Sequence, residues 1–253
     1  MGFGGFTLAE VLIILGIIGI VATLTIPNLV AKYQKAQTVQ RLKLVYSQLN
    51  EAIRLSEVEN DDISGWNFEQ PSSSSFEQYL APYMKIAQVS STNSSSGFHG
   101  DGIKYYEISG NLTTLMWILR SPVDIYKTIN GTDLILFKTS SSGSFVGSKQ
   151  MSIYVDLNGI KTPPNQYGKD FFSIVISGKD GKRIYFPGTY SSSEYTFPQE
   201  PNTDRAILKE TKSDKSYYLK GNYRYGCNKN ALGHWCGRLI QVDGWKIKDD
   251  YPW

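Results

Sequence analysis

Carboxylate and amide side chains are concentrated in one short segment, between residues 156 and 170. Asp156, Asn158 and Asp170 lie there among glycines and prolines, and oxygen ligands of this kind suit calcium. The segment is not an EF-hand, because the acidic fifth position and the closing glutamate are absent. The alternative is a turn-rich connection, with a turn at Asn158-Gly159 and a stretch stiffened by two consecutive prolines. The sequence leaves both a calcium site and a purely structural loop open.

Side chains suited to acid–base or nucleophilic catalysis are scarce. The chain of 253 residues has two histidines, His99 and His234, so few groups titrate near neutral pH. None of the short motifs of serine hydrolases, zinc peptidases or nucleotide-binding proteins occurs. The formal net charge of +3 is too small to indicate nucleic acid as a partner. The sequence therefore predicts no enzyme, and no cofactor apart from the candidate calcium ion.

The most unusual part of the chain is an almost uninterrupted apolar stretch near the N-terminus. It follows Phe6-Thr7-Leu8-Ala9-Glu10 and runs from Val11 to Val30, broken only by glycine, threonine, Pro27 and Asn28. Twenty helical residues span ~30 Å, the thickness of the hydrocarbon core of a bilayer. A helix in the core of a soluble protein is rarely apolar on every side over that length. The pattern predicts a membrane segment, in which the carboxylate of Glu10 needs a partner or a task.

This N-terminal pattern resembles the processing site of type IV prepilins and of type II secretion pseudopilins. The shared features are Gly5, an aromatic Phe6, then threonine, leucine, one unspecified residue and Glu10, followed by the apolar stretch. In that family a membrane-bound prepilin peptidase cuts after the glycine and methylates the new amino group. The resemblance implies cleavage between Gly5 and Phe6 and N-methylation of Phe6. It also implies assembly with like or related pilin subunits on an inner-membrane platform.

The same resemblance implies a location. The subunit would first be held in the lipid of the bacterial inner membrane by its N-terminal helix, with an extracytoplasmic head. It would then enter a periplasmic or cell-surface filament. In pilins a proline near the position of Pro27 marks a stretch that melts when the subunit leaves the bilayer. A static kink is the alternative, because proline removes one helix hydrogen bond.

The charge of Glu10 has a physical role in such a filament. Cleavage would create an ammonium group at Phe6, and a cation buried in an apolar filament core needs an anion. Glu10 of an adjacent subunit would form a charge-assisted pair with it. A subunit in the wrong axial register would leave both charges unpaired, so we expect Glu10 to set the register of assembly.

Cys227 and Cys236 are the only cysteines, and they lie close together near the C-terminus. Two cysteines in an extracytoplasmic head normally pair, and a disulfide-closed C-terminal loop is also common in pilins. A loop of about ten residues predicts a stabilisation of roughly 2.5–3 kcal/mol. A zinc site with His234, and with His99 as a further ligand, is the alternative, although the spacing matches no usual zinc pattern.

Beyond the apolar stretch, helical periodicity continues and then gives way to short strands. Apolar residues at three- and four-residue steps predict an amphipathic helix that covers a sheet; they are Val39, Leu42, Val45, Tyr46, Leu49, Ala52 and Ile53. The candidate strands are Ile103–Ile108, Leu134–Phe137, Met151–Asp156, Phe171–Ile176, Arg183–Phe186 and Gln241–Ile247. Serine-rich stretches predict exposed loops at 72–75, 90–96, 140–144 and 191–193.

These patterns predict an α+β, type IV pilin-like fold in three parts. The first part is a leader peptide over residues 1–5. The second is a helix over 6–59, apolar in its membrane or filament-core half (about 6–31) and amphipathic in the rest. The third is a head over 60–253, built on an antiparallel β-sheet.

Three functional hypotheses remain open from the sequence. The leading one is a structural subunit of a type IV pilus or a type II secretion pseudopilus. The second is a minor or tip subunit whose large head is adhesive or binds DNA. The third is an uncleaved single-pass membrane protein with a cytoplasmic head, because the leader lacks lysine and arginine whereas Lys32, Lys35, Arg41 and Lys43 follow the apolar segment. A secretory signal peptide would need basic residues first and a small-residue cleavage site after a shorter core.

Overall fold

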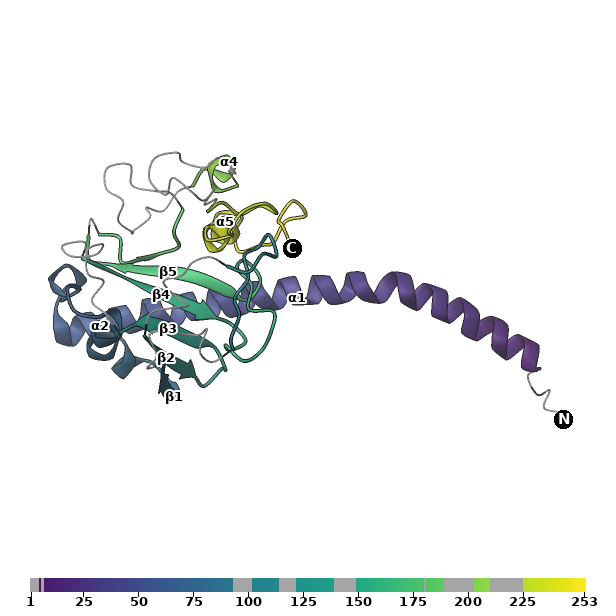
Figure 1. The fold of residues 1–253 in the computed structure, drawn as a ribbon, viewed down its shortest axis with the longest axis horizontal. Coiled ribbons are helices and arrows are strands. Elements are labelled where there is room, and N and C mark those ends of the chain that lie inside the picture. The colour runs from purple at the N-terminus through teal and green to yellow at the C-terminus, as the bar shows by residue number, and fades with distance from the viewer. Residues whose placement is uncertain are drawn as a thin grey trace. The chain divides into compact units, whose positions relative to one another are not determined.

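The structure is a computed structural model that describes residues 5, 7–92, 102–113, 122–138, 149–179, 181–188, 203–209 and 225–253. The chain divides into two compact units, residues 1–37 and 38–253. The first unit contains the beginning of helix α1 (Leu8–Asn60), and the second contains the rest of α1 together with a β-sheet (Figure 1). Phe6 and His99 lie outside the described residues.

In the first unit, α1 exposes large apolar side chains on every side. Leu8, Ile20 and Leu29 are 79%, 65% and 68% exposed, and by length and composition this helix could cross a membrane. The helix is continuous through Pro27. The hydroxyls of Thr23 and Thr25, which interrupt the apolar stretch, donate hydrogen bonds of 2.7 and 2.8 Å to backbone carbonyls four residues earlier. These polar groups are therefore satisfied within the helix itself, as an apolar surrounding requires.

In the second unit, α1 buries the predicted apolar stripe. Its later part crosses one face of the sheet (Figure 1). Fully or almost fully buried on this side are Leu42, Val45, Leu49, Ala52 and Ile53, with Val39 and Tyr46 partly buried beside them. Three- and four-residue spacing places these side chains on one side of a helix. The predicted amphipathic half of the helix is confirmed.

The sheet is an antiparallel meander in which consecutive strands are neighbours, in the order β1-β2-β3-β4-β5-β6. The strands are β1 (Ile86–Ser91), β2 (Val123–Thr128), β3 (Asp133–Phe137), β4 (Gln150–Asp156), β5 (Phe171–Ser177) and β6 (Ile184–Tyr185). The central strands β4 and β5 pair over their whole length, from Gln150 opposite Ser177 to Asp156 opposite Phe171. Side chains on both faces of these two strands are buried. Long helix and antiparallel sheet together confirm the predicted α+β fold.

Successive side chains of a strand point to opposite faces of the sheet, and the apolar side chains form two clusters, one on each face. The larger cluster joins the stripe of α1 to residues such as Leu134, Ile153 and Ile174. The smaller one contains Ile135 and Tyr154 from the opposite face, with Tyr105, Tyr167, Phe171 and Leu232. The loop that connects β4 to β5 contributes Tyr167 to this second cluster. The smaller cluster therefore fixes part of that loop against the sheet.

Several predicted elements differ from the structure. Residues 72–75 are not an exposed loop but begin helix α2 (Ser72–Tyr79), where Phe76 and Tyr79 are buried. The predicted strand Gln241–Ile247 is wrong, because the end of helix α5 (Cys236–Val242) precedes a turn at Gly244, whose φ is +74°. The predicted strand Ile103–Ile108 contains only isolated bridges at Tyr106. The other short helices among the described residues are η1 (Ile63–Gly65), η2 (Ala81–Tyr83) and α4 (Arg205–Leu208).

Candidate functional site

The residues predicted to direct assembly, Gly5, Phe6 and Glu10, lie just before and within the first turn of α1. Gly5 is exposed and precedes the helix, and the neighbouring Phe6 is not among the described residues. The backbone N–H and the hydroxyl of Thr7 each donate a 2.8 Å hydrogen bond to Oε2 of Glu10, and the Thr7 hydroxyl accepts one from the Glu10 N–H at 3.3 Å. This reciprocal arrangement is a capping box. It gives the Glu10 carboxylate partners within its own chain.

The two cysteines form the predicted disulfide. Cys227 and Cys236 are buried and bonded to each other. The alternative zinc site is wrong, because both thiols are used in this bond. His234 lies within the closed loop but is buried, and it faces the rings of Tyr154, Tyr167 and Tyr225.

The carboxylates of the predicted calcium site lie at the two ends of the β4–β5 loop. Asp156 ends β4 and is fully buried; its Oδ2 accepts a 2.9 Å hydrogen bond from the Tyr105 hydroxyl. Asp170 directly precedes β5 and accepts hydrogen bonds from the backbone N–H groups of Asn165 (2.8 Å) and Gln166 (2.6 Å). The structure therefore brings together residues that are fourteen positions apart, because β4 and β5 are adjacent antiparallel strands.

The surroundings of this pair oppose ionisation of its carboxyl groups. Burial, and after it the negative charge of Asp170, raises the pKa of Asp156 to about 8. Burial also raises the pKa of Asp170, although the N–H groups of Gln166 and Asn165 act in the opposite direction. Within the described part of the chain, neither carboxylate is in an ion pair with lysine or arginine. Two neighbouring buried carboxyl groups thus lack a positive partner from those residues.

Amide groups complete the interior of the loop. Nδ2 of Asn158 donates to the carbonyl oxygens of Thr162 (2.8 Å) and Pro163 (3.2 Å). Nδ2 of Asn165 donates to the carbonyl of Ile160 at 2.9 Å. The Oδ1 atoms of both asparagines are buried and have no hydrogen-bond partner among the described residues. Buried polar atoms are nearly always paired, so two such oxygens in one loop are unusual.

Two glycines allow the backbone conformation of the β4–β5 loop. Gly159 and Gly168 have φ values of +88° and +78°, which side chains with a Cβ rarely adopt. A Cβ on Gly168 would lie 2.6 Å from Cδ1 of Ile108 and 2.9 Å from Sγ of Cys236. The loop therefore packs closely against the disulfide.

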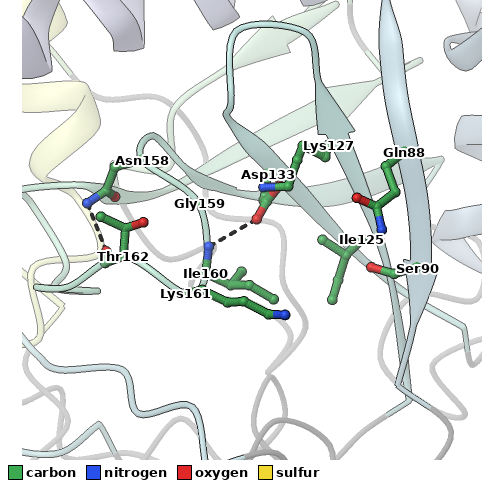
Figure 2. A pocket seen from close by; sticks show the side chains of 10 residues that line it. All are labelled: Gln88, Ser90, Ile125, Lys127, Asp133, Asn158, Gly159, Ile160, Lys161 and Thr162. Atoms are coloured by element: carbon green, nitrogen blue, oxygen red, sulfur yellow. Dashed lines mark hydrogen bonds and ion pairs between the residues drawn. The ribbon is translucent and has the colours of Figure 1, made fainter.

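A small open pocket borders the outer side of the loop. It has a volume of about 200 Å³, and Figure 2 shows Asn158 and Thr162 on the side of the loop, with Lys127 and Asp133 on the neighbouring strands. Asp133 accepts a 3.0 Å hydrogen bond from the Ile160 N–H and pairs with Nζ of Lys127 at 2.7 Å. Thr162 is exposed, so solvent and small ions can reach this side of the loop.

The loop is also attached to α1, a relationship that the sequence did not indicate. The Thr38 hydroxyl donates a 2.7 Å hydrogen bond to the carbonyl of Lys169, next to Asp170. A guanidinium nitrogen of Arg41 donates to the carbonyl of Leu157, next to Asp156, at 3.1 Å. Thr38 and Arg41 are three residues apart on the helix and thus on the same side. Both ends of the loop are therefore bound to the helix where the second unit begins.

Comparison with known proteins identifies the family. The model of the family described as "Family of unknown function (DUF6613)" matches residues 28–253. The chain belongs to DUF6613. This DUF6613 protein is also similar to the type IV wide pilus major component PilA4 of Thermus thermophilus, with 29% identity over 125 residues. The matched region is 49% of this chain and 86% of that protein. No solved structure gives a significant match.

The distant relationship to a pilus component agrees with the long apolar N-terminal helix and the α+β fold. The DUF6613 protein is thus pilin-like, as the motif at its N-terminus predicted.

Proposed function

We propose that this DUF6613 protein is a structural, non-catalytic subunit of a type IV pilus. The observation that supports this most strongly is the composition of α1, which is apolar and exposed in its first part and packed into the head in its second. Apolar side chains that no other part of the chain buries are unfavourable in water. This part of the helix therefore needs lipid or other copies of the same helix around it. The similarity to a wide pilus component favours a pilus over a secretion pseudopilus.

The N-terminal contacts support a specific route of assembly. Prepilin peptidase would cleave between Gly5 and Phe6 and methylate Phe6. In the precursor, Thr7 supplies hydrogen bonds to Glu10, which lowers the cost of placing that carboxylate near the membrane. In the filament, the ammonium of Phe6 from an adjacent subunit would become the charged partner. Pro27 would then mark the stretch of α1 that loosens when the subunit leaves the bilayer.

The location and partners follow from this route. The subunit would be anchored in the bacterial inner membrane by α1 with its head outside the cytoplasm, where the disulfide between Cys227 and Cys236 is stable. Its partners would be like or related pilin subunits, the peptidase and the inner-membrane assembly platform. Its final place would be a filament in the periplasm or on the cell surface.

The proposal is tested by recovering the protein from filaments sheared off the cells. The native chain should be found in this fraction. Glu10→Ala should remain in the membrane and be at least roughly ten-fold depleted from filaments, since an unpaired buried ammonium costs several kcal/mol.

The matched control is Glu51→Ala, which removes an exposed carboxylate from the same helix outside the apolar stretch. This variant should assemble normally. Normal incorporation of Glu10→Ala would contradict the register role. Absence of the native chain from every filament preparation would contradict the proposed function itself.

A further inference from the structure

Strand β1 lies at one edge of the sheet and is its least covered strand (Figure 1). Among the described residues it pairs with β2 alone. The side chains from Ala87 to Ser91 are exposed, and Val89 retains 53% of its accessible surface. Every residue of β4 and β5, by contrast, is buried. The backbone ladder to β2 is therefore the main support of β1 in the isolated head.

The ladder to β2 determines which backbone groups of β1 point outward. The N–H of Thr92 donates a 2.9 Å hydrogen bond to the carbonyl of Val123, and the same register continues back along β1. In an antiparallel pair, residues that bond to the neighbouring strand alternate with residues that do not. Thr92 and Ser90 therefore point their backbone groups toward β2, whereas Val89 and Ser91 point theirs away from the sheet. Two donors and two acceptors are thus offered to a further strand.

This edge lacks the features that usually prevent edge strands from pairing. Natural edges are protected by charges, prolines or bulges. The bulge of β1 lies at its beginning, between Ile86 and Gln88, and the preceding Lys85 is the nearest charged residue on that side. From Gln88 to Thr92 the chain contains neither a charged residue nor a proline. An extended strand can therefore be added at this edge.

We propose that β1 of one copy pairs antiparallel with β1 of a second copy, about a two-fold axis at Ser90. In this register Val89 of each copy lies opposite Ser91 of the other, and their outward groups form four backbone hydrogen bonds. Ser90 lies opposite Ser90 of the second copy as a closely spaced pair, a position that its small side chain suits. Lys85 lies outside the paired residues, so the two edges bring no like charges together.

The self-complementarity of this edge favours a second copy over an unrelated peptide, because a two-fold contact requires each surface to match itself. A single pair of six-residue strands buries less than the roughly 1,000 Å² of a stable interface, so one contact is weak. Many such contacts between two filaments would add up to stable association.

The direction of α1 decides which subunits can meet in this way. The two-fold axis of an antiparallel strand pair is perpendicular to the sheet, and α1 crosses a face of the sheet (Figure 1). The axis therefore reverses the direction of α1. Subunits of one filament all point the same way, so the contact would join filaments that run in opposite directions. This last step rests on the proposed function, whereas the pairing of two β1 strands does not.

The test of strand pairing uses the full chain in detergent, with micelles in excess so that α1 does not bring two chains together. Ser90→Cys should form a disulfide-linked dimer on mild oxidation, because the two side chains lie side by side at the axis. The native cysteines are buried and bonded to each other, so they do not compete. Ser64→Cys, an exposed control in η1, should give at least roughly ten-fold less dimer.

A proline at position 89 separates pairing from the stability of the head. In the Ser90→Cys chain, Val89→Pro removes two of the four proposed hydrogen bonds but none to β2, since this N–H points outward. The dimer yield should fall at least about ten-fold, while the midpoint of thermal unfolding stays within about 2 °C. Val89→Thr, the matched control, keeps the N–H and the β-branch, so its dimer yield should equal that of Ser90→Cys alone.

Two outcomes would overturn the pairing: a dimer yield of Ser90→Cys no higher than that of Ser64→Cys, or a yield that Val89→Pro leaves unchanged. If Val89→Pro does not fold, Val89→Lys decides the same point, because it places a charge in both paired segments. In sheared filaments, oxidised Ser90→Cys should join filaments side by side under the electron microscope. Cross-linked dimers within separate single filaments would contradict the opposite direction but leave filament formation, and thus the proposed function, intact.

Discussion

The hydroxyl group of Tyr251 donates a 2.5 Å hydrogen bond to the carbonyl oxygen of Gly168, and both residues are buried. This bond joins the C-terminal end of the chain to the β4–β5 loop. The ring of Tyr251 packs in the larger apolar cluster, together with Cys227 and Cys236 of the disulfide. The last residues, the disulfide and the loop therefore form one packed region of the head.

Removal of that hydroxyl should destabilise the head while the ring stays in place. Tyr251→Phe leaves the buried carbonyl of Gly168 without its donor, which costs about 1–3 kcal/mol. The free energy of unfolding in urea measures the loss. Tyr83→Phe removes a hydroxyl from a partly exposed ring and should cost less than about 1 kcal/mol. Equal losses for the two variants would contradict the importance of the Tyr251 bond.

Replacement of Gly168 by alanine should lower the free energy of unfolding more than the same replacement at Gly181, a second glycine with a positive φ. Gly168→Ala combines a φ of +78° with a Cβ only 2.6 Å from Ile108, so we expect a loss of about 2–5 kcal/mol. Gly181 has a φ of +68° and no atom within 4 Å of its Cβ position. Gly181→Ala should therefore cost only about 1–2 kcal/mol, from backbone strain. Urea unfolding of the pair isolates the contribution of close packing, and a Gly168→Ala loss no larger than that of Gly181→Ala would refute it.

The buried stripe of α1 should dominate the contribution of this helix to stability. Leu49 is fully buried against the sheet, and truncation of such a side chain costs about 2–5 kcal/mol. Leu44 lies on the same helix and is 45% exposed. Leu44→Ala should cost less than about 1 kcal/mol, as surface changes usually do. Thermal or urea unfolding of the two variants is the measurement, and comparable losses would mean that this side of α1 does not face the sheet.

His234 should make the head sensitive to acid. Burial among the rings of Tyr154, Tyr167 and Tyr225 lowers its pKa to about 3. The unfolded chain takes up a proton below about pH 6.5 that the folded chain does not. Stability is therefore complete above pH 6.5 and lost progressively as the pH falls toward 3, by up to ~1.4 kcal/mol per pH unit.

The carboxyl of Asp156, whose pKa is raised to about 8, has the opposite effect over part of this range, so the comparison must be made with a variant. His234→Gln removes only the histidine contribution. Between pH 8 and pH 5, the native chain should lose about 2 kcal/mol more than this variant. Parallel pH profiles of the two proteins would show that His234 is protonated in the folded state.

The sequence predicted those parts of the fold in which one periodicity extends over many residues. The stripe from Val39 to Ile53 repeats at helical spacing, and strands β3, β4 and β5 are runs of β-branched and aromatic residues. Elements with mixed local signals were predicted wrongly. Four serines suggested a loop at α2, but the spacing of Phe76 and Tyr79 is helical and their burial decides the structure.

The candidate site was predicted only in part. Asp156, Asn158 and Asp170 are recognisable because calcium-type ligands occur at short spacing in a turn-rich segment. Tyr105, Thr38 and Arg41 are distant in the sequence, and they meet the loop only through the packing of the sheet and of α1. The significance of Asn165 depends on its burial beside Asp170, which no sequence pattern reveals.

Assembly of this protein through a processed N-terminal helix is tested most directly by the mass of its N-terminal peptide. The protein is taken from sheared filaments and digested, and the first peptide is identified by mass spectrometry. We expect a chain that begins at Phe6 with one methyl group on its amino nitrogen. A first peptide that still begins at Met1 would contradict this account.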